Sequence, residues 1–152
     1  MIGGCGGDGD GATTPEGFGS TLLRVLPAGL EWCVWLADTP ERRQRGLMEV
    51  TDLGAGMDGM LFAFDEPSTG GFWMRNTPTP LSIAYLDGDG ALVSTADMTP
   101  CDDRDDCPSY GAAGPYTWAI EVPRGGLARL GVLDEGARVE VLGRSCHTPR
   151  AD

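Results

Sequence analysis

The sequence predicts a mostly β domain, a β-rich α+β fold built as a small single-domain barrel or folded sheet with one or two short helices. Two observations support this prediction. Short apolar stretches alternate with polar residues, as in half-buried strands, and glycine-rich turns separate them. The chain has 152 residues, of which 41% are hydrophobic, which is enough for one packed domain and not comfortably for two.

The first predicted elements are a strand and a short helix. Residues 30–37 alternate in character and predict the strand. Directly after it, Thr39, Pro40 and Glu41 are typical of a helix N-cap, a first helical position and a first turn. Gly46 then predicts the end of that helix.

The rest of the folded chain predicts short strands joined by turns. We expect these strands over residues 59–64, 71–74, 81–85, 91–96, 116–122 and 137–142. The turn sequence Asp87-Gly88-Asp89-Gly90 predicts a hairpin between two of them. Residues 125–131 predict one or two helical turns.

The two ends of the chain differ from its middle in composition. Residues 1–20 hold eight glycines together with Asp8 and Asp10, and such a segment buries too little apolar surface to fold. We therefore expect a flexible tether over residues 1–20, a folded domain over residues 21–146 and a tail over residues 147–152.

Cys5 lies in this tether behind a run of small residues, as at the cleavage site of a bacterial lipoprotein. Acyl chains on Cys5 would hold the domain at a membrane surface without a spanning helix. The basic and apolar regions of a signal peptide do not precede Cys5 here, so this hypothesis places them upstream of the present sequence. The alternative is a free cysteine in the tether.

The other four cysteines predict two disulfides. Cys101 and Cys107 flank a loop rich in aspartate, which a bridge between them would hold together, and Cys33 is then left to pair with Cys146. A zinc site is the alternative, but the chain has no CxxC spacing. Two disulfides imply an oxidising, extracytoplasmic compartment.

The composition also excludes some classes of partner. The formal net charge is −12, so the chain offers little attraction to a nucleic acid backbone. No apolar stretch is long enough to predict a transmembrane helix. The sequence has no glycine motif between a predicted strand and a predicted helix, where nucleotide binding needs it, and none of the usual hydrolase motifs, and we expect no cofactor.

Four blocks of the sequence resemble, in the same order, the domain of unknown function 192 family. They are residues 37–48, residues 59–64, residues 72–77 with Pro80 and Leu81, and the stretch from Trp118 to Gly126. The resemblance covers residues 34–143 and implies a compact β-rich domain, often exported or lipid-anchored, with no established biochemical role. This chain departs from the family at Arg75, where lysine is usual, and at Ser82, where an acid is usual.

One of these blocks supplies the candidate binding site. Trp73 and Arg75 would share one face of a strand, and an aromatic ring beside a guanidinium suits a sugar or a small carboxylate. Asn76 follows as a polar contact, and Arg45 would bring a second guanidinium from the helix. The alternative places Trp73 in the core, with Arg75 bonded to backbone carbonyls or paired with Glu121.

Two rival functions remain open. Met48, Met60 and Met74 are soft ligands for Cu(I), although core packing also explains methionines in apolar blocks. In the second rival, all the motif blocks belong to the core of an envelope interaction or scaffolding domain. The aspartates of the two loops also invite a Ca²⁺ interpretation, for which turns are the simpler explanation.

The sequence does not favour an enzyme. His147 is the single histidine, and its neighbour Cys146 is assigned to a disulfide. Asp97 and Glu121 could act as acid and base only if the fold brings them together. We therefore expect a monomeric, non-enzymatic binding module for a small polar or carbohydrate-like ligand. It would be lipid-anchored at the cell envelope, with a small ligand or an envelope protein as its partner.

Overall fold

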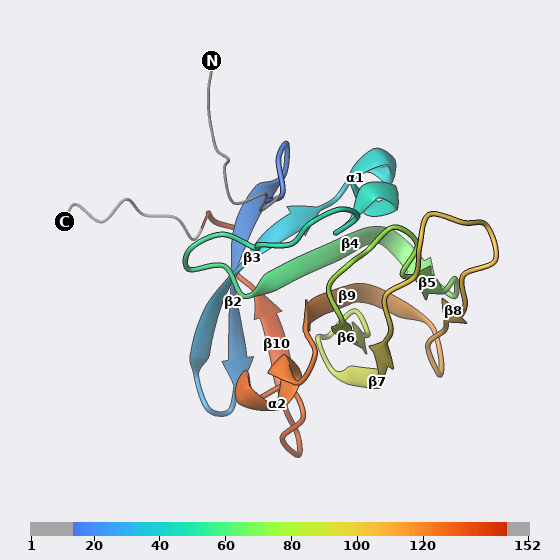
Figure 1. Ribbon diagram of the computed structural model, residues 1–152. Coiled ribbons are helices and arrows are strands. Elements are labelled where there is room, and N and C mark those ends of the chain that lie inside the picture. The colour runs from blue at the N-terminus through green and yellow to red at the C-terminus, as the bar shows by residue number, and fades with distance from the viewer. Residues whose placement is uncertain (1–13, 146–152) are drawn as a thin grey trace.

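A seven-stranded sheet forms the body of the protein in the computed structural model, which describes residues 14–145 (Figure 1). The sheet curls into a half-barrel, and a two-stranded sheet lies beside it. The predicted mostly β class, with two short helices, is confirmed.

The elements follow one another closely along the chain. In order they are β2 (Gly19–Leu26), β3 (Leu30–Ala37), α1 (Pro40–Arg45), β4 (Gly59–Ser68), β5 (Phe72–Trp73), β6 (Leu81–Leu86), β7 (Leu92–Met98), β8 (Ser109–Tyr110), β9 (Tyr116–Pro123), α2 (Gly126–Arg129) and β10 (Arg138–Val141). The large sheet has the order β10-β2-β3-β4-β9-β6-β7, and β5 pairs with β8. Neighbouring strands of the large sheet are antiparallel, except for β3 and β4, which are parallel and are connected through α1.

The first predicted elements match the structure closely. The strand over residues 30–37 is β3, and α1 begins at Pro40. The Thr39 hydroxyl accepts a hydrogen bond from the Arg42 backbone N–H at 3.1 Å, which satisfies one of the free donors of the first turn. Gly46 ends the helix with a positive φ of 47° that few other residues adopt easily.

Two strands were not among the predicted elements. β2 pairs with β10 on one side and β3 on the other, and the two-residue β8 pairs with β5. The short pairing with β5 places β8 beside the predicted binding block.

The sheet buries a separate apolar cluster on each face. The α2-side core includes Leu61, Ile120, Val122, Leu127 and Leu130. The α1-side core includes Leu47, Met60, Phe62, Met74, Ile83, Tyr85, Met98, Tyr116 and Ala119. Successive residues of β9 alternate between the two, because side chains of a strand point to opposite faces in turn.

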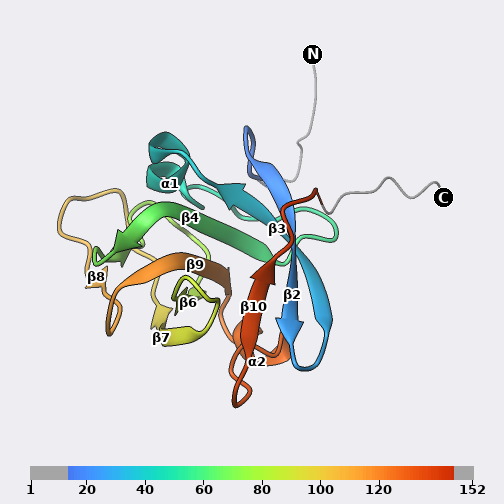
Figure 2. The same cartoon turned by 180° about the vertical axis from the view of Figure 1, so that it is seen from behind.

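The turn between β6 and β7 contacts β10, the strand at the other edge of the large sheet. Ala91 forms an isolated bridge with Arg138, and the Val139 N–H donates to the Gly90 carbonyl at 2.9 Å. Gly90 has a φ of 85°, and a Cβ at this position would collide with the Val139 carbonyl oxygen. Figure 2 shows β10 next to β2 on the face turned away in Figure 1.

The predicted disulfide between Cys101 and Cys107 is present, with an S–S distance of 2.03 Å. Cys5 and Cys146 lie outside the described residues, so the lipid anchor and the pairing of Cys33 with Cys146 stay predictions. Among residues 14–145, no helix has the length and apolar character needed to cross a membrane.

Candidate functional site

The candidate site is a pocket of about 270 Å³ on the α1 side of the sheet. Its wall is formed by α1 and the turn after it, by β4, and by the segment from Gly70 to Met74. Five aromatic side chains line it, namely Phe62, Phe64, Phe72, Trp73 and Tyr116. Such a concave, mostly apolar site with a few polar groups is typical of small-molecule binding.

Glu121 of β9 is the single acid among the described residues that line this pocket. Its cross-strand neighbours are Met60 on β4 and Ile83 on β6, so its carboxyl lies within the α1-side core. Glu121 is 4% exposed, and no hydrogen bond or ion pair joins its carboxyl group to another residue of the described chain. This burial raises the pKa of Glu121 to about 8.

Two arginines of α1 face the pocket and differ in their bonding. Arg43 donates to the Ala63 carbonyl at 2.8 Å, and its guanidinium lies over the Phe64 ring, 5.0 Å from the centroid. Arg43 is therefore held as part of the wall. Arg45 is exposed, and its side chain makes no hydrogen bond or ion pair within residues 14–145, so its guanidinium is available at the pocket mouth.

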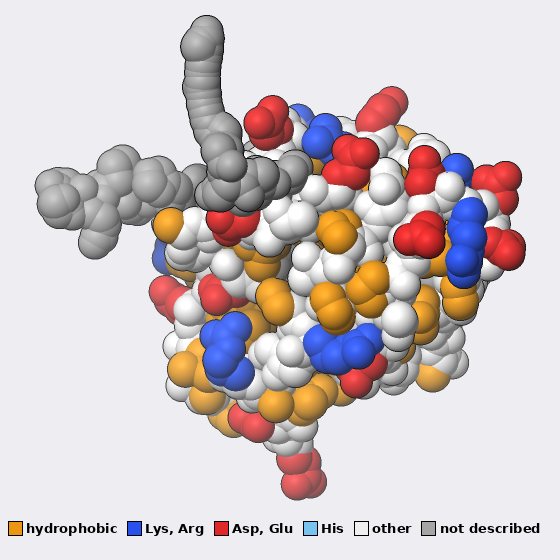
Figure 3. All heavy atoms as spheres, viewed as in Figure 1, with side chains coloured by type: hydrophobic (Ala, Val, Ile, Leu, Met, Phe, Trp, Pro, Cys, Tyr) orange, Lys and Arg blue, Asp and Glu red, His pale blue; other side chains and the backbone are white. Residues whose placement is uncertain are grey.

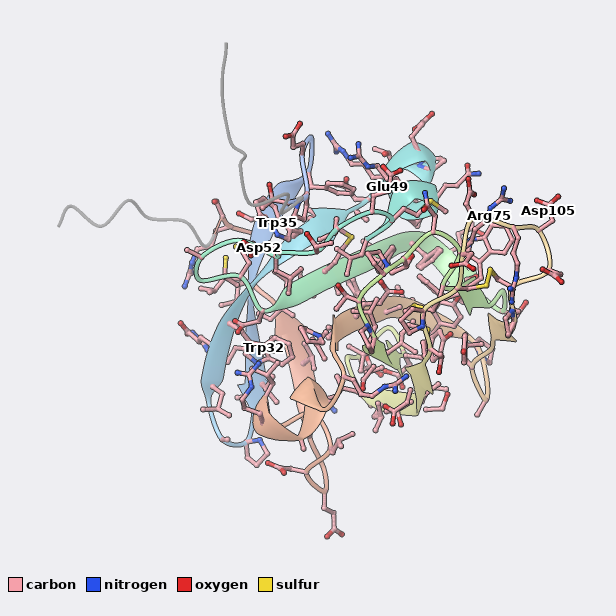
Figure 4. All side chains as sticks on the ribbon, viewed as in Figure 1. Trp32, Trp35, Glu49, Asp52, Arg75 and Asp105 are labelled. Atoms are coloured by element: carbon pink, nitrogen blue, oxygen red, sulfur yellow. A yellow bond between two sulfur atoms is a disulfide. The ribbon has the colours of Figure 1, made fainter. Side chains whose placement is uncertain are left out.

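Trp73 lines the pocket, and the Arg75 guanidinium lies over its ring. Trp73 is 39% exposed, and the Arg75 guanidinium lies 5.4 Å from the centroid of its ring. Arg75 also donates to Asp103 at 2.8 Å and to Asp105 at 2.7 Å. Figure 4 shows Arg75 and Asp105 close together at the edge of the molecule, where Figure 3 shows acidic side chains around a basic one.

The four predicted binding residues thus do not share one site. Arg45 and Trp73 line the pocket, whereas Arg75 is occupied by the disulfide loop. Asn76 lines a separate hollow of about 240 Å³ and donates to Glu49 at 3.3 Å. The alternative pairing of Arg75 with Glu121 is wrong, because the two aspartates of the disulfide loop take that guanidinium.

The suggested acid–base pair of Asp97 and Glu121 is not brought together. Ser82 pairs with both Asp97 and Val122 across the sheet, and Ile83 pairs with Glu121. Asp97 and Glu121 consequently point to opposite faces. At the position where the family usually has an acid, the Ser82 hydroxyl donates to Asp97 at 2.7 Å and accepts from the Gly125 N–H at 3.1 Å.

The three methionines of the Cu(I) hypothesis are all on this side of the sheet. Met48 and Met74 line the pocket, and Met60 lies beside Glu121 with 0% exposure. Among the residues that the structure describes, no group of three or more His, Cys, Asp or Glu side chains could hold a metal.

The role of Glu121 in a pocket was not predicted from the sequence. The alternation over residues 116–122 places Glu121 in phase with Thr117 and Ala119, which resembles the polar face of a strand, so nothing in the sequence indicated that Glu121 is buried. An acid at a core-facing strand position needs either a partner or a function. The aromatic residues of the wall could not be assembled without the order of the strands.

Comparisons with known proteins agree with the resemblance. A protein described as a candidate transcription regulator from Sinorhizobium meliloti has a crystal structure that is 27% identical, with a TM-score of 0.70 over 84% of this chain and 97% of that one. A protein of unknown function from Novosphingobium aromaticivorans is 33% identical, with a TM-score of 0.65 over 78% of this chain and 83% of that one. No curated protein matches the chain. The model of the DUF192 family, described as an uncharacterised ACR, matches residues 24–141, and the chain belongs to this family.

Proposed function

We propose that this DUF192 domain is a non-enzymatic binding module for a small polar ligand, which it holds in the pocket between α1 and the sheet. The observation that carries the proposal is the buried Glu121 carboxyl, which has no partner in the described chain and lines the pocket. Such a group loses part of its hydration on burial, which costs stability. A ligand that bonds to it would recover that cost.

Trp73 and Arg45 would make the outer contacts of this ligand. An exposed indole offers a flat apolar face, and a guanidinium that is not already paired can donate two hydrogen bonds to a carboxylate or phosphate. Arg75 and Asn76 would support the site without touching the ligand. Arg75 contacts the Trp73 ring, and Asn76 connects the neighbouring turn to Glu49 by a hydrogen bond.

The relative described as a transcription regulator suggests DNA binding, but the charge of this chain argues against it. The formal net charge is −12, and the two carboxylates around Arg75 reduce its attraction for phosphate. The Cys101–Cys107 disulfide supports a different setting, an oxidising compartment outside the cytoplasm. There a lipid on Cys5 would keep the monomeric domain at the envelope.

A thermal-shift screen of the full chain with its disulfides intact tests the proposal. The panel holds sugars, small carboxylates, phosphates, amines, zwitterions that carry both an ammonium and an acid, Cu(I) and Ca²⁺. A ligand at a hundred times its Kd stabilises by about 2.7 kcal/mol, which is a shift of roughly 5–10 °C for a domain of this size. Any hit is then measured against Trp73→Ala and Arg45→Gln, with the exposed Arg129→Gln as the matched control.

We expect Trp73→Ala and Arg45→Gln each to weaken binding about tenfold or more while the unliganded melting temperature changes little. Arg129→Gln should change neither. A panel without any hit would contradict the proposal, as would a ligand whose affinity is unchanged in both pocket variants. A Cu(I) shift that Met74→Leu removes would favour the metal alternative, which the shared position of Met48 and Met74 supports.

A further inference from the structure

The pocket contains several aromatic rings and a single carboxyl group, and this combination favours ligands of one chemical class. The rings meet edge to face, with 4.9 Å between the centroids of Phe62 and Phe72 and 5.4 Å between those of Phe64 and Tyr116. In an edge-to-face pair the edge of one ring lies against the face of the other, which fixes the rings in the wall, and a ring face that stays open attracts cations. The wall already carries one cation, because the Arg43 guanidinium lies over Phe64.

On the basis of the proposed binding function, we infer that the ligand carries an organic ammonium group, which binds among these rings against Glu121, and an anionic group, which Arg45 binds at the mouth. Aromatic rings with a carboxylate are the surroundings that protein sites offer to alkylammonium groups. Glu121 is the single acid that the described part of the pocket provides.

The anionic group follows from the charges at the mouth. Arg43 and Arg45 both line the pocket and would repel a ligand that is only a cation. A small zwitterion avoids this repulsion, because its acid group meets Arg45 while its ammonium reaches the buried end. The volume of about 270 Å³ suits a molecule of metabolite size.

Binding of an ammonium group should depend on pH through Glu121. The titratable groups around it are Tyr85 on β6, which interacts with Glu121, and Tyr116 on β9 and the two arginines of α1, which line the same pocket. Burial raises the pKa of both tyrosines, and arginine stays charged. Across the neutral range, Glu121 is therefore the group of this set whose charge changes.

The sign of the pH dependence follows directly. Burial raises the pKa of Glu121 to about 8, and an ammonium ligand pairs with the ionised form. Affinity should rise about tenfold for each pH unit below that pKa, level off above it, and be accompanied by proton release. A ligand that instead accepts a hydrogen bond from the protonated acid would show the opposite trend.

The test is calorimetry on the full chain with pairs of probes that share a shape and differ in one charge. Glycine betaine is compared with 3,3-dimethylbutanoate, and 4-aminobutanoate with pentanoate, each at pH 6, pH 7 and pH 8.5. At pH 8.5 we expect the ammonium member of at least one pair to bind about tenfold more tightly than its carbon analogue. Buffers of different ionisation enthalpy report the released proton.

Glu121→Gln keeps the shape of the side chain and removes its charge, so it should abolish both the preference and the pH dependence. Glu140→Gln, on the exposed part of β10, is the matched control and should change neither. Equal affinity within both pairs, or a preference that survives Glu121→Gln, would overturn the inference. The proposed function would still stand if sugars or simple acids bind the pocket, and it would fail with the inference if no probe of either panel binds.

Discussion

The two cores of the sheet differ in what they contain and in what they leave open. The α2-side core is mainly aliphatic, with Leu61, Ile120 and Val122 packed against Leu127 of α2. The α1-side core has aromatic and methionine side chains, and Glu121 lies among them. The candidate binding pocket opens on the α1 side. One face of the sheet therefore supplies stability, and the other is arranged around a polar group that costs stability.

This difference in composition is expected between a core that only stabilises the fold and a core that also forms a binding site. Apolar side chains that are closely packed contribute most to the free energy of folding. A buried acid without a hydrogen-bond partner reduces stability. Residues that cost stability in this way are concentrated at functional sites. The comparison can be tested one face at a time.

The largest effect should come from the α2-side core. Leu61 is fully buried, and Leu61→Ala should lower the free energy of unfolding by about 4 kcal/mol through lost contacts and a cavity. Urea denaturation measures this change, and ligand affinity measured at a temperature where the variant is folded should stay near that of the wild type. Strong loss of affinity in the folded variant would show that the two cores are not independent.

The pH dependence of stability should come from the α1-side core. The native state holds a proton on Glu121 that the unfolded chain releases above its ordinary pKa of 4.5, since burial raises the native pKa to about 8. Stability from this group is therefore full at acid pH and declines as pH rises, by about 3 kcal/mol between pH 5 and pH 8. Urea denaturation across this range should show the decline, and Glu121→Gln should flatten it. A slope that persists in the variant would assign it to other groups.

A smaller effect is expected from the disulfide loop that braces the pocket mouth. Replacing Cys101 and Cys107 together by serine should cost about 2 kcal/mol, since the bridge closes a short loop. Asp103 and Asp105 would then hold Arg75 less firmly, and the Trp73 ring should lose its support. Denaturation gives the first effect, and ligand affinity gives the second. Unchanged affinity in the double variant would limit the loop to a role in stability.

The smallest effect should come from the start of α1. Thr39→Ala removes the side-chain hydrogen bond to Arg42 and should cost about 1 kcal/mol. Thr39→Ser retains the hydroxyl and serves as the control. Because α1 holds Arg45 at the mouth, we also expect slightly weaker binding, which calorimetry can measure. Equal stability of the alanine and serine variants would contradict the capping role.

Much of the fold could be predicted, because its signals are local. The alternation over residues 30–37 and the capping residues Thr39 and Gly46 act within a few positions. β2 was harder, since its first residues share the small, polar character of the segment before them. Its strand structure depends on pairing with β3, which follows it directly in the chain, and with β10, which lies more than a hundred residues later.

The site could be predicted only in part, for the same reason. Trp73 and Arg45 stand out in the sequence by their chemistry, and both line the pocket. Arg75 also stands out, but its partners in the disulfide loop could not be known before the loop was placed. Glu121 becomes significant only when β4 and β6 are known to flank β9, because that register surrounds it with apolar side chains.

The contact between Gly90 and Val139 has a consequence for engineering the protein. The β6–β7 turn has the composition of an ordinary surface turn, and such turns are common places for tags and linkers. Here the turn also joins the two ends of the curled sheet, so an inserted peptide would separate β7 from β10. A reporter group is better attached at Gly111, where a side chain would meet open space.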